Sequence, residues 1–266
     1  MAAVAVRLEK LAGTDAHEGP VYLADEHALL FTTVPRPGPR TSIRRLDLTT
    51  LALETLVEDA NMANGMTLDR EGRLVVCEQG GFDRPARLSR DGETLVAGLN
   101  SPNDVVVARD GSIWFTDPSY GFLQGFRPPP EQPDRVYRFE PVHGRLAVVT
   151  ESPGKPNGLA LSPDERTLYV GDSSDRREVV AVDLASGAER TFAADIPGYP
   201  DGLKTDASGR VYASSADGIL IFDPDGRQAG EIPLPGAVNF TFGGRDGDVL
   251  YVTADDAVWA AHPKGA

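Results

Sequence analysis

The chain has 266 residues and a formal net charge of −14, with 26 Lys and Arg against 40 Asp and Glu. This acidic balance, with no basic stripe, argues against nucleic acid as a partner, because phosphate groups are bound by clustered positive charge. The single cysteine, Cys77, rules out an intramolecular disulfide, and the N-terminal segment MAAVAVRLEKLAG is too short and too charged for a signal segment or a membrane span. We therefore expect a cytoplasmic protein that does not associate with membranes.

A unit consisting of a polar residue, an apolar strand, a turn and a second apolar strand recurs six times along the chain. The copies begin at Glu18 (EGPVYLADEHALLFTTV), Asn64 (NGMTLDREGRLVVCEQ), Asn103 (NDVVVARDGSIWFTD), Asn157 (NGLALSPDERTLYVGD), Asp201 (DGLKTDASGRVYASSA) and Asn239 (NFTFGGRDGDVLYVTA). Their turns, such as DGS and SGR, place Gly or Asp where tight connections need left-handed backbone. Each copy therefore predicts a β-hairpin.

A second pair of strands follows several hairpins, at 135–150, 179–192 and 218–232. Four antiparallel strands repeated about every 40 to 50 residues are typical of propeller blades, so the repeats predict an all-β, six-bladed β-propeller formed by residues 1–266 as one domain. The sixth copy has only three strands, the third at 257–262. We expect the segment Ala3 to Leu8 to supply the fourth and close the ring. A β-sandwich is the alternative, but it does not explain six similar units.

The six leading polar residues are the candidate functional site, because the first strand of each propeller blade lines the central channel. They supply two carboxylates, Glu18 and Asp201, and four amides. Hard oxygen donors of this kind suit Ca²⁺, which takes about six to eight of them in irregular geometry. The histidines lack metal-ligand spacing and no cysteine pair exists, which disfavours Zn²⁺; Zn²⁺, Mg²⁺ and Mn²⁺ are the alternatives to Ca²⁺. In any single copy, Asn or Asp before Gly could equally well be there to form a turn and have no role in the site.

The second strand of each hairpin runs antiparallel to the first, so its end should return to the face that carries the leading polar residue. We expect a set of polar side chains at these ends to surround the same mouth: Glu78, Gln79, Asp117, Tyr120 and Asp172. The longest connection, 118–134, should lie on this face, either as a lid or specificity element over the site or as a plain surface loop. His17 should point away from the side that Glu18 faces, so we interpret it as structural.

Five segments resemble the family of senescence marker protein, gluconolactonase and luciferin-regenerating enzyme. They are HEGPVY (17–22), LNSPNDVVVARDGSIWFTDPSYG (99–121), KPNGLALSPDERTLYVGDS (155–173), PDGLKTDASGRVY (200–212) and NFTFGGRDGDVLYVTA (239–254). The second segment is similar to bacterial gluconolactonases in particular. The resemblance implies a calcium propeller in which Glu18, Asn157 and Asp201 bind the metal, with Asn103 as a further ligand or a substrate contact. It also implies that Asp201 is the general base.

Two positions depart from the family's pattern. Gln79 stands where similar bacterial enzymes commonly carry His, and Ser101 stands where animal members have an Arg that contacts sugar. Both departures weaken the expectation of a sugar lactone and leave the implied metal ligands in place. We assign Gln79 and Ser101, with Asn103 and Tyr120, to the predicted substrate site.

Together these residues predict a calcium-dependent hydrolase that opens a small lactone. The metal would polarise the carbonyl group, and Asp201 would orient or deprotonate the attacking water. The sequence contains no GxSxG elbow, P-loop or GxGxxG fingerprint, so serine hydrolases, nucleotide hydrolases and dinucleotide enzymes have no support. A phosphotriesterase on the same metal and a non-catalytic metal- or ligand-binding propeller are the alternatives. The expected partner is a small-molecule substrate, and the sequence predicts no oligomeric state.

Overall fold

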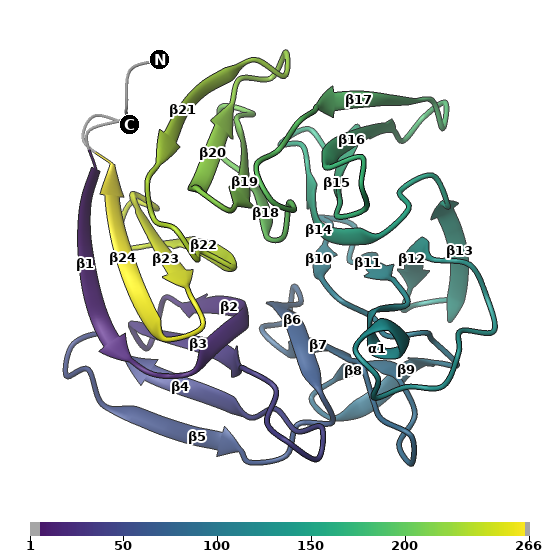
Figure 1. Ribbon diagram of the computed structural model, residues 1–266, viewed down its shortest axis with the longest axis horizontal. Helices are drawn as coiled ribbons and strands as arrows, with labels where there is room; N and C mark the ends of the chain where they lie inside the picture. The colour runs from purple at the N-terminus through teal and green to yellow at the C-terminus, as the bar shows by residue number, and fades with distance from the viewer. Residues whose placement is uncertain (1–5, 264–266) are drawn as a thin grey trace.

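Six four-stranded antiparallel sheets surround a central axis in the computed structural model, which describes residues 6–263 (Figure 1). The six-bladed β-propeller predicted from the repeats is therefore confirmed. In each of the first five blades the four strands pair in chain order, from the inner strand at the channel to the outer strand at the rim. The described residues contain one short helix, α1 (Tyr120–Leu123), and none that is long and apolar enough to cross a membrane.

The strands are assigned to the blades as follows. Blade 1 contains β2 (Ala16–Leu23), β3 (Ala28–Thr33), β4 (Ile43–Asp47) and β5 (Leu53–Val57), and blade 2 contains β6 (Ala63–Leu68), β7 (Leu74–Glu78), β8 (Arg87–Arg90) and β9 (Glu93–Ala97). Blade 3 contains β10 (Val105–Val107), β11 (Ile113–Asp117), β12 (Arg135–Glu140) and β13 (Arg145–Thr150). Blade 4 contains β14 (Pro156–Leu161), β15 (Thr167–Asp172), β16 (Glu178–Asp183) and β17 (Glu189–Ala193). Blade 5 contains β18 (Leu203–Thr205), β19 (Val211–Ser215), β20 (Gly218–Phe222) and β21 (Gln228–Ile232), and blade 6 contains β22 (Asn239–Gly243), β23 (Val249–Thr253), β24 (Ala257–Pro263) and β1 (Val6–Gly13).

The N-terminal strand closes the last blade, as predicted. β1 pairs antiparallel with β24 from Val6 opposite Pro263 to Gly13 opposite Ala257, and the two strands run side by side in Figure 1. The strand continues past Leu8, its predicted end, while Ala3, its predicted start, lies outside the described residues. β1 therefore gives blade 6 the same four strands as the other blades and links the first and last repeats in one sheet.

The hydrophobic core consists of six clusters, one between each pair of neighbouring blades. Side chains of a strand alternate between its two faces, so each blade presents apolar residues to both of its neighbours. Between blades 4 and 5, for example, the rings of Tyr169 and Phe192 have centroids 4.8 Å apart, and Phe192 packs on Phe222 at 6.1 Å. Apolar burial between the blades leaves the inner strands free to carry polar residues at the axis.

Candidate functional site

The six leading polar residues occupy equivalent places at the inner strands. Asn103 and Asp201 precede β10 and β18 by two residues, and the other four lie within β2, β6, β14 and β22. Hydrogen bonds connect these places across blade boundaries: Gly65 N donates to Asn103 O at 2.7 Å, and Gly158 N donates to Asp201 O at 2.9 Å. The expected convergence of the leading residues at one end of the channel is therefore present in the structure.

Glycine follows four of the leading residues because the inner strands approach each other closely there. A Cβ atom at Gly65 would lie 2.5 Å from Asn103 O, and one at Gly158 would lie 2.0 Å from Asp201 O. The same kind of clash occurs at Gly19 and Gly202. Of these four glycines only Gly19, with φ of 56°, has left-handed backbone. Interpretation of the Asn–Gly and Asp–Gly pairs as turn formers is therefore wrong, because these glycines permit strand contact.

Glu18, which is buried, and Asp201, which is partly buried, form a pair of carboxylates. Glu18 is 2% exposed, and its Oε2 accepts hydrogen bonds from Asn239 Nδ2 at 2.7 Å and from Gly19 N at 3.0 Å. Burial raises the pKa of Glu18, and burial together with the negative charge of Glu18 raises the pKa of Asp201 well above its usual range. Two neighbouring carboxylates repel each other unless a positive charge or a proton lies between them. The pair is thus a place that favours a cation.

Several buried oxygen atoms near this pair have no hydrogen-bond partner. They are the amide oxygens Asn64 Oδ1, Asn103 Oδ1 and Asn157 Oδ1. Buried polar atoms are almost always satisfied, so a group of unsatisfied oxygens around one axis indicates a missing positive ligand. Across residues 6–263 no three His, Cys, Asp or Glu side chains cluster as a metal site, so a cation here must draw on amide oxygens as well. An all-oxygen, mixed carboxylate and amide set fits Ca²⁺ and does not fit Zn²⁺, which prefers nitrogen and sulfur.

Ser173 orients the amide of Asn157. Its hydroxyl accepts from Asn157 Nδ2 at 3.2 Å and donates to Pro200 O at 2.6 Å. The amide nitrogen is therefore occupied, and Oδ1 is the atom of Asn157 left without a protein partner. Ser173, the residue after strand β15, therefore leaves the oxygen of the Asn157 amide, and not its nitrogen, available as a ligand. The sequence did not predict this contact.

Two further channel residues were missed by the sequence analysis, Asp104 and Lys204. Asp104 is 2% exposed. Burial is the main cause that raises the pKa values of Glu18 and Asp201, and the negative charge of Asp104 adds to both shifts. The ammonium group of Lys204 lies 3.7 Å from Asp104 Oδ2 and 3.3 Å from Asn239 Oδ1. The aligned repeats could have identified both residues. Directly after the leading residue, four copies have Gly and the third has Asp104. Three residues after the leading residue, Lys204 of the fifth copy is the one charged side chain among the six.

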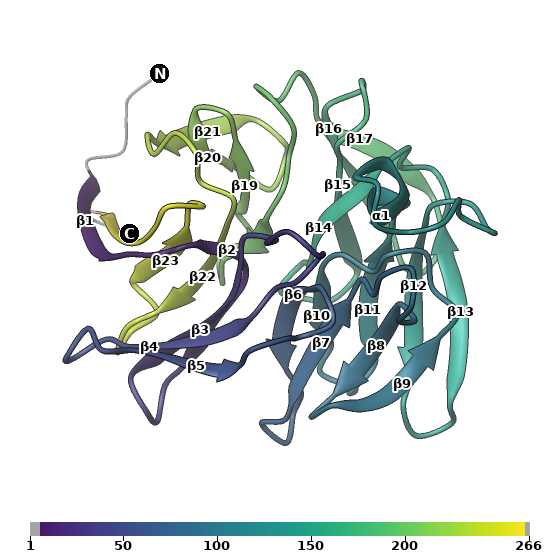
Figure 2. The ribbon, with the colours of Figure 1, turned by 60° about the horizontal axis from the view of Figure 1, so that its bottom comes forward.

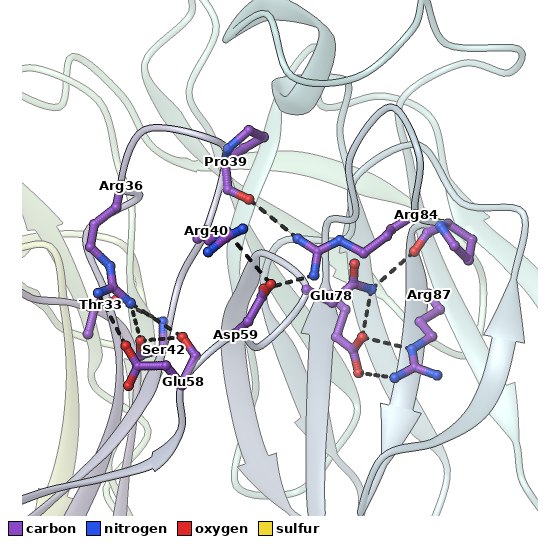
Figure 3. A network of polar contacts seen from close by, with 12 residues as sticks. Thr33, Arg36, Pro39, Arg40, Ser42, Glu58, Asp59, Glu78, Arg84 and Arg87 are labelled. Atoms are coloured by element: carbon purple, nitrogen blue, oxygen red, sulfur yellow. Dashed lines mark hydrogen bonds and ion pairs between the residues drawn. The ribbon is translucent and has the colours of Figure 1, made fainter.

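The predicted rim carboxylate Glu78 lies on the expected face, but its oxygens bind residues of blade 2 and of the loop that leads into it. Its two oxygens accept from Arg87 Nε and Nη2 at 2.7 and 2.9 Å, and it also accepts from Asn61 Nδ2 at 2.7 Å (Figure 3). Figure 3 also shows Arg84 extending from this blade to Asp59, at 2.8 Å, on the connection from blade 1. This network joins the loops of two blades, so Glu78 has a structural task.

Asp117 and Asp172 also lie at the ends of their strands and bind local backbone. Asp117 accepts from the N–H groups of Asn100 and Ser101, both at 2.9 Å, and burial raises its pKa to about 7. Asp172 accepts from Gly154 N at 3.0 Å and forms an ion pair with Arg176 at 2.6 Å. Strand direction therefore predicted the face of these carboxylates correctly, whereas their hydrogen bonds turn them toward neighbouring loops.

The predicted substrate residues have different surroundings. The Tyr120 hydroxyl donates to Lys155 O at 3.2 Å. Burial is the main cause that raises the pKa of Tyr120, and the charge of Asp201 contributes to the same shift. Gln79 is 4% exposed and its N–H donates to Met62 O at 3.0 Å. Ser101 is fully buried, and its hydroxyl donates to Pro118 O at 2.7 Å and accepts from Gly121 N at 2.9 Å.

The segment 118–134, which contains α1, rises from blade 3 on the site face (Figure 2). The Arg127 guanidinium ties it down by donating to four backbone carbonyls, those of Gly81, Arg84, Leu99 and Asn100, at 3.1 to 3.2 Å. The Ser101 hydroxyl holds the start of the same segment by donating to Pro118 O. These hydrogen bonds anchor the segment to the loops of blades 2 and 3, and we call it the wall.

His17 links the first and last blades. Its Nδ1 lies 2.7 Å from Asp255 Oδ1, in the turn between β23 and β24. The burial of His17 acts to lower its pKa, but Asp255 and Glu18 outweigh it, so the pKa is raised. This pairing across the ring closure is consistent with the structural interpretation of His17.

Comparison with known proteins gives one consistent result. The family model described as "SMP-30/Gluconolactonase/LRE-like region" matches residues 16–256. A gluconolactonase of Zymomonas mobilis is 29% identical, with 93% of this chain and 78% of that protein covered. A pentonolactonase of Haloferax volcanii is 28% identical, with 89% and 80% covered. The solved structure of a gluconolactonase from Xanthomonas campestris superimposes with a TM-score of 0.84 at 34% identity, covering 97% of this chain and 90% of that one.

Proposed function

Because the chain belongs to the SMP-30/gluconolactonase/LRE-like family, we propose that it is a metal-dependent lactonase whose active site is the channel mouth around Glu18 and Asp201. The observation that carries the proposal is the group of unpartnered buried oxygens beside a repelling pair of carboxylates. The relatives named gluconolactonase and pentonolactonase support a lactone as the substrate. We propose Ca²⁺ as the ion.

The proposed ligands are Glu18, Asn157 and Asp201, with Asn103 as a further ligand or a substrate contact. Asn103 and Asn157 each keep a free amide oxygen, as a ligand requires. Asn239 is excluded, because its Nδ2 donates to Glu18 and its Oδ1 accepts from its neighbour Phe240 N at 2.8 Å. When bound, the ion supplies the positive charge that polarises a substrate carbonyl and offsets the charge of the carboxylates.

Asp201 is the proposed catalytic residue because it differs from Glu18 in exposure. Glu18 is almost fully buried and held by two hydrogen bonds, whereas Asp201 is only partly buried, so water and substrate can reach it. Asp201 would accept a hydrogen bond from the attacking water and orient it toward the carbonyl carbon. Since a nearby cation lowers the pKa of a carboxyl group, orientation of the water is its main contribution and proton transfer a smaller one.

The substrate would lie between the channel mouth and the wall formed by 118–134. Tyr120, which belongs to that wall, is the proposed contact for a substrate hydroxyl group: its own proton is donated to Lys155 O, so its oxygen can accept from the substrate. Gln79 is a second proposed polar contact. We propose that Ser101 acts indirectly, because both hydrogen-bonding directions of its hydroxyl serve the wall. With Gln79 and Ser101 in these positions, a lactone with few hydroxyl groups fits the site better than a polyhydroxylated sugar lactone.

The test is a hydrolysis assay that follows acid release from a panel of five- and six-membered lactones, beside a panel of organophosphate triesters, each with Ca²⁺ and with chelator. We expect chelator-sensitive lactone hydrolysis. Asp201→Asn should lower kcat/KM by about 100-fold or more, because positioned acid–base groups contribute at least that much. Asp223→Asn, an exposed aspartate of the same blade, is the matched control and should hydrolyse lactones like the wild type.

Full metal-dependent activity of Asp201→Asn would contradict the assignment of Asp201. Hydrolysis of the triesters with inactivity on every lactone would identify a phosphotriesterase. Tight Ca²⁺ binding with hydrolysis of neither panel would identify a binding propeller.

A further inference from the structure

Lys204 brings a positive charge into the channel next to the proposed metal site. It belongs to the inner strand β18, three residues after Asp201, and its side chain is 28% exposed. Its stem lines a cavity of about 480 Å³ at the other end of the channel, together with aliphatic residues such as Val107 and Leu161. Its ammonium group, in contrast, reaches the polar ring, where it lies near Asp104 and Asn239.

The positive charge of Lys204 compensates the negative charge of the buried Asp104 carboxylate. Its side chain is 3% exposed; Oδ1 accepts from Val105 N at 2.9 Å, and Oδ2 has no hydrogen bond. The ammonium group 3.7 Å from Oδ2 is the cation that the structure places beside it. A buried carboxylate without a counter-charge is strongly destabilising, so this pair has a clear energetic role.

Asn239 is oriented by the same ammonium group. Its Oδ1 accepts from Lys204 Nζ at 3.3 Å, which leaves Nδ2 to donate to Glu18 Oε2 at 2.7 Å. If the amide were reversed, its NH₂ group would face the ammonium and its oxygen would face the Glu18 carboxylate, and both contacts would be repulsive. Lys204 and the Phe240 N–H, which donates to the same Oδ1 at 2.8 Å, together hold Asn239 so that it donates to Glu18 instead of offering an oxygen to a cation.

The charges of the site balance with one divalent ion. Glu18, Asp104 and Asp201 contribute −3, and Lys204 contributes +1, which leaves −2. His17 and Asp255, next to the ring, form a pair of their own at 2.7 Å. We propose that Lys204 is a positioning residue and an internal counter-ion of the channel: it neutralises Asp104, orients Asn239, and so matches the ring to a single divalent cation. This inference rests on the proposed metal site.

The test is calorimetric titration of Ca²⁺ into chelator-stripped protein. Lys204→Met keeps the stem and removes the charge, so we expect the affinity for Ca²⁺ to rise by about tenfold or more, since a like charge a few ångströms away is lost. In chelator the same variant should melt about 5–10 °C below the wild type, because Asp104 is left unpaired. Lys204→Arg, the control that keeps the charge, should stay within about threefold of the wild-type affinity.

The double variant Asp104→Asn/Lys204→Met restores a ring charge of −2 and should return both the affinity and the melting temperature toward the wild type. A residue with only a packing role would lower affinity and stability in Lys204→Met and would not be rescued by Asp104→Asn, and that result would overturn the proposal. If the wild type binds no divalent cation, the proposed metal site fails, and the melting temperatures in chelator still decide whether Lys204 neutralises Asp104. Equal melting of the wild type, single and double variants would refute it.

Discussion

Replacement of Gly158 by alanine should destabilise the protein and disturb the metal site at once. A Cβ atom there would lie 2.0 Å from Asp201 O and 2.7 Å from Leu203 N, both backbone atoms that cannot rotate away. Strands β14 and β18 would have to separate, and the 2.9 Å hydrogen bond from Gly158 N to Asp201 O would break. Overpacking costs about 1–3 kcal/mol and a lost hydrogen bond about 1 kcal/mol, so we expect a loss of about 3 kcal/mol.

A loss of about 3 kcal/mol corresponds to a fall in Tm of roughly 6–12 °C for a domain of this size. Thermal unfolding in chelator measures this fall, and calcium titration of the folded variant should show weaker binding because Asp201 is displaced. Gly13→Ala is the matched control, since a Cβ there would meet only Lys10 Cε at 3.9 Å. If Gly158→Ala melted within about 2 °C of this control and bound Ca²⁺ equally well, the close approach of the inner strands would not be the reason for glycine.

Two further variants test the wall and the rim. Arg127→Met removes a guanidinium that donates to four carbonyls, so 118–134 should be cleaved severalfold faster in limited proteolysis. Arg227, whose side chain is 86% exposed, provides the control: Arg227→Met should be cleaved like the wild type. Equal cleavage of the two variants would speak against an anchored wall. Burial acts to raise the pKa of Asp172, but hydrogen bonds, that of Ser174 N first, outweigh it and hold the pKa below 3.8. A carboxyl with a lowered pKa stabilises the fold above its unfolded pKa and loses that contribution as the pH falls through its folded pKa. Asp172→Asn should therefore have a lower urea midpoint than the wild type at pH 7, with a gap that narrows as the pH falls through and below the usual aspartate range; a constant gap would show that the charge is not the cause.

The blades could be predicted because their signals are local and repeated. Alternating apolar residues and Gly- or Asp-containing turns define each hairpin within about fifteen residues, and six copies in one register leave few architectures open. Strand direction was also enough to place Glu78, Asp117 and Asp172 on the correct face. Their hydrogen bonds to nearby N–H groups and arginines depend on loop conformations, which the alternation of strand residues does not report.

The contacts between blades could not be predicted in the same way. Asp104 and Lys204 lie in different blades, and their pairing depends on the radius of the ring and the rotation of each inner strand. The extent of β1 was underestimated for a similar reason, because its partner β24 lies at the other end of the chain. For the glycines, the sequence indicated their positions but not their cause, since Gly65 and Gly158 are required by a neighbouring strand and not by their own backbone.

The pairing of β1 with β24 also has a consequence for biosynthesis. During synthesis β1 emerges long before β24, its partner, so β1 has no sheet to join until β24 has emerged. Until then, the apolar cluster between blades 6 and 1, which includes Phe31 and Val258, lacks one side, and Glu18 lacks its hydrogen bond from Asn239. A nascent or truncated chain therefore exposes an unpaired strand and has an incomplete channel, and it depends on protection from aggregation until the last blade is made.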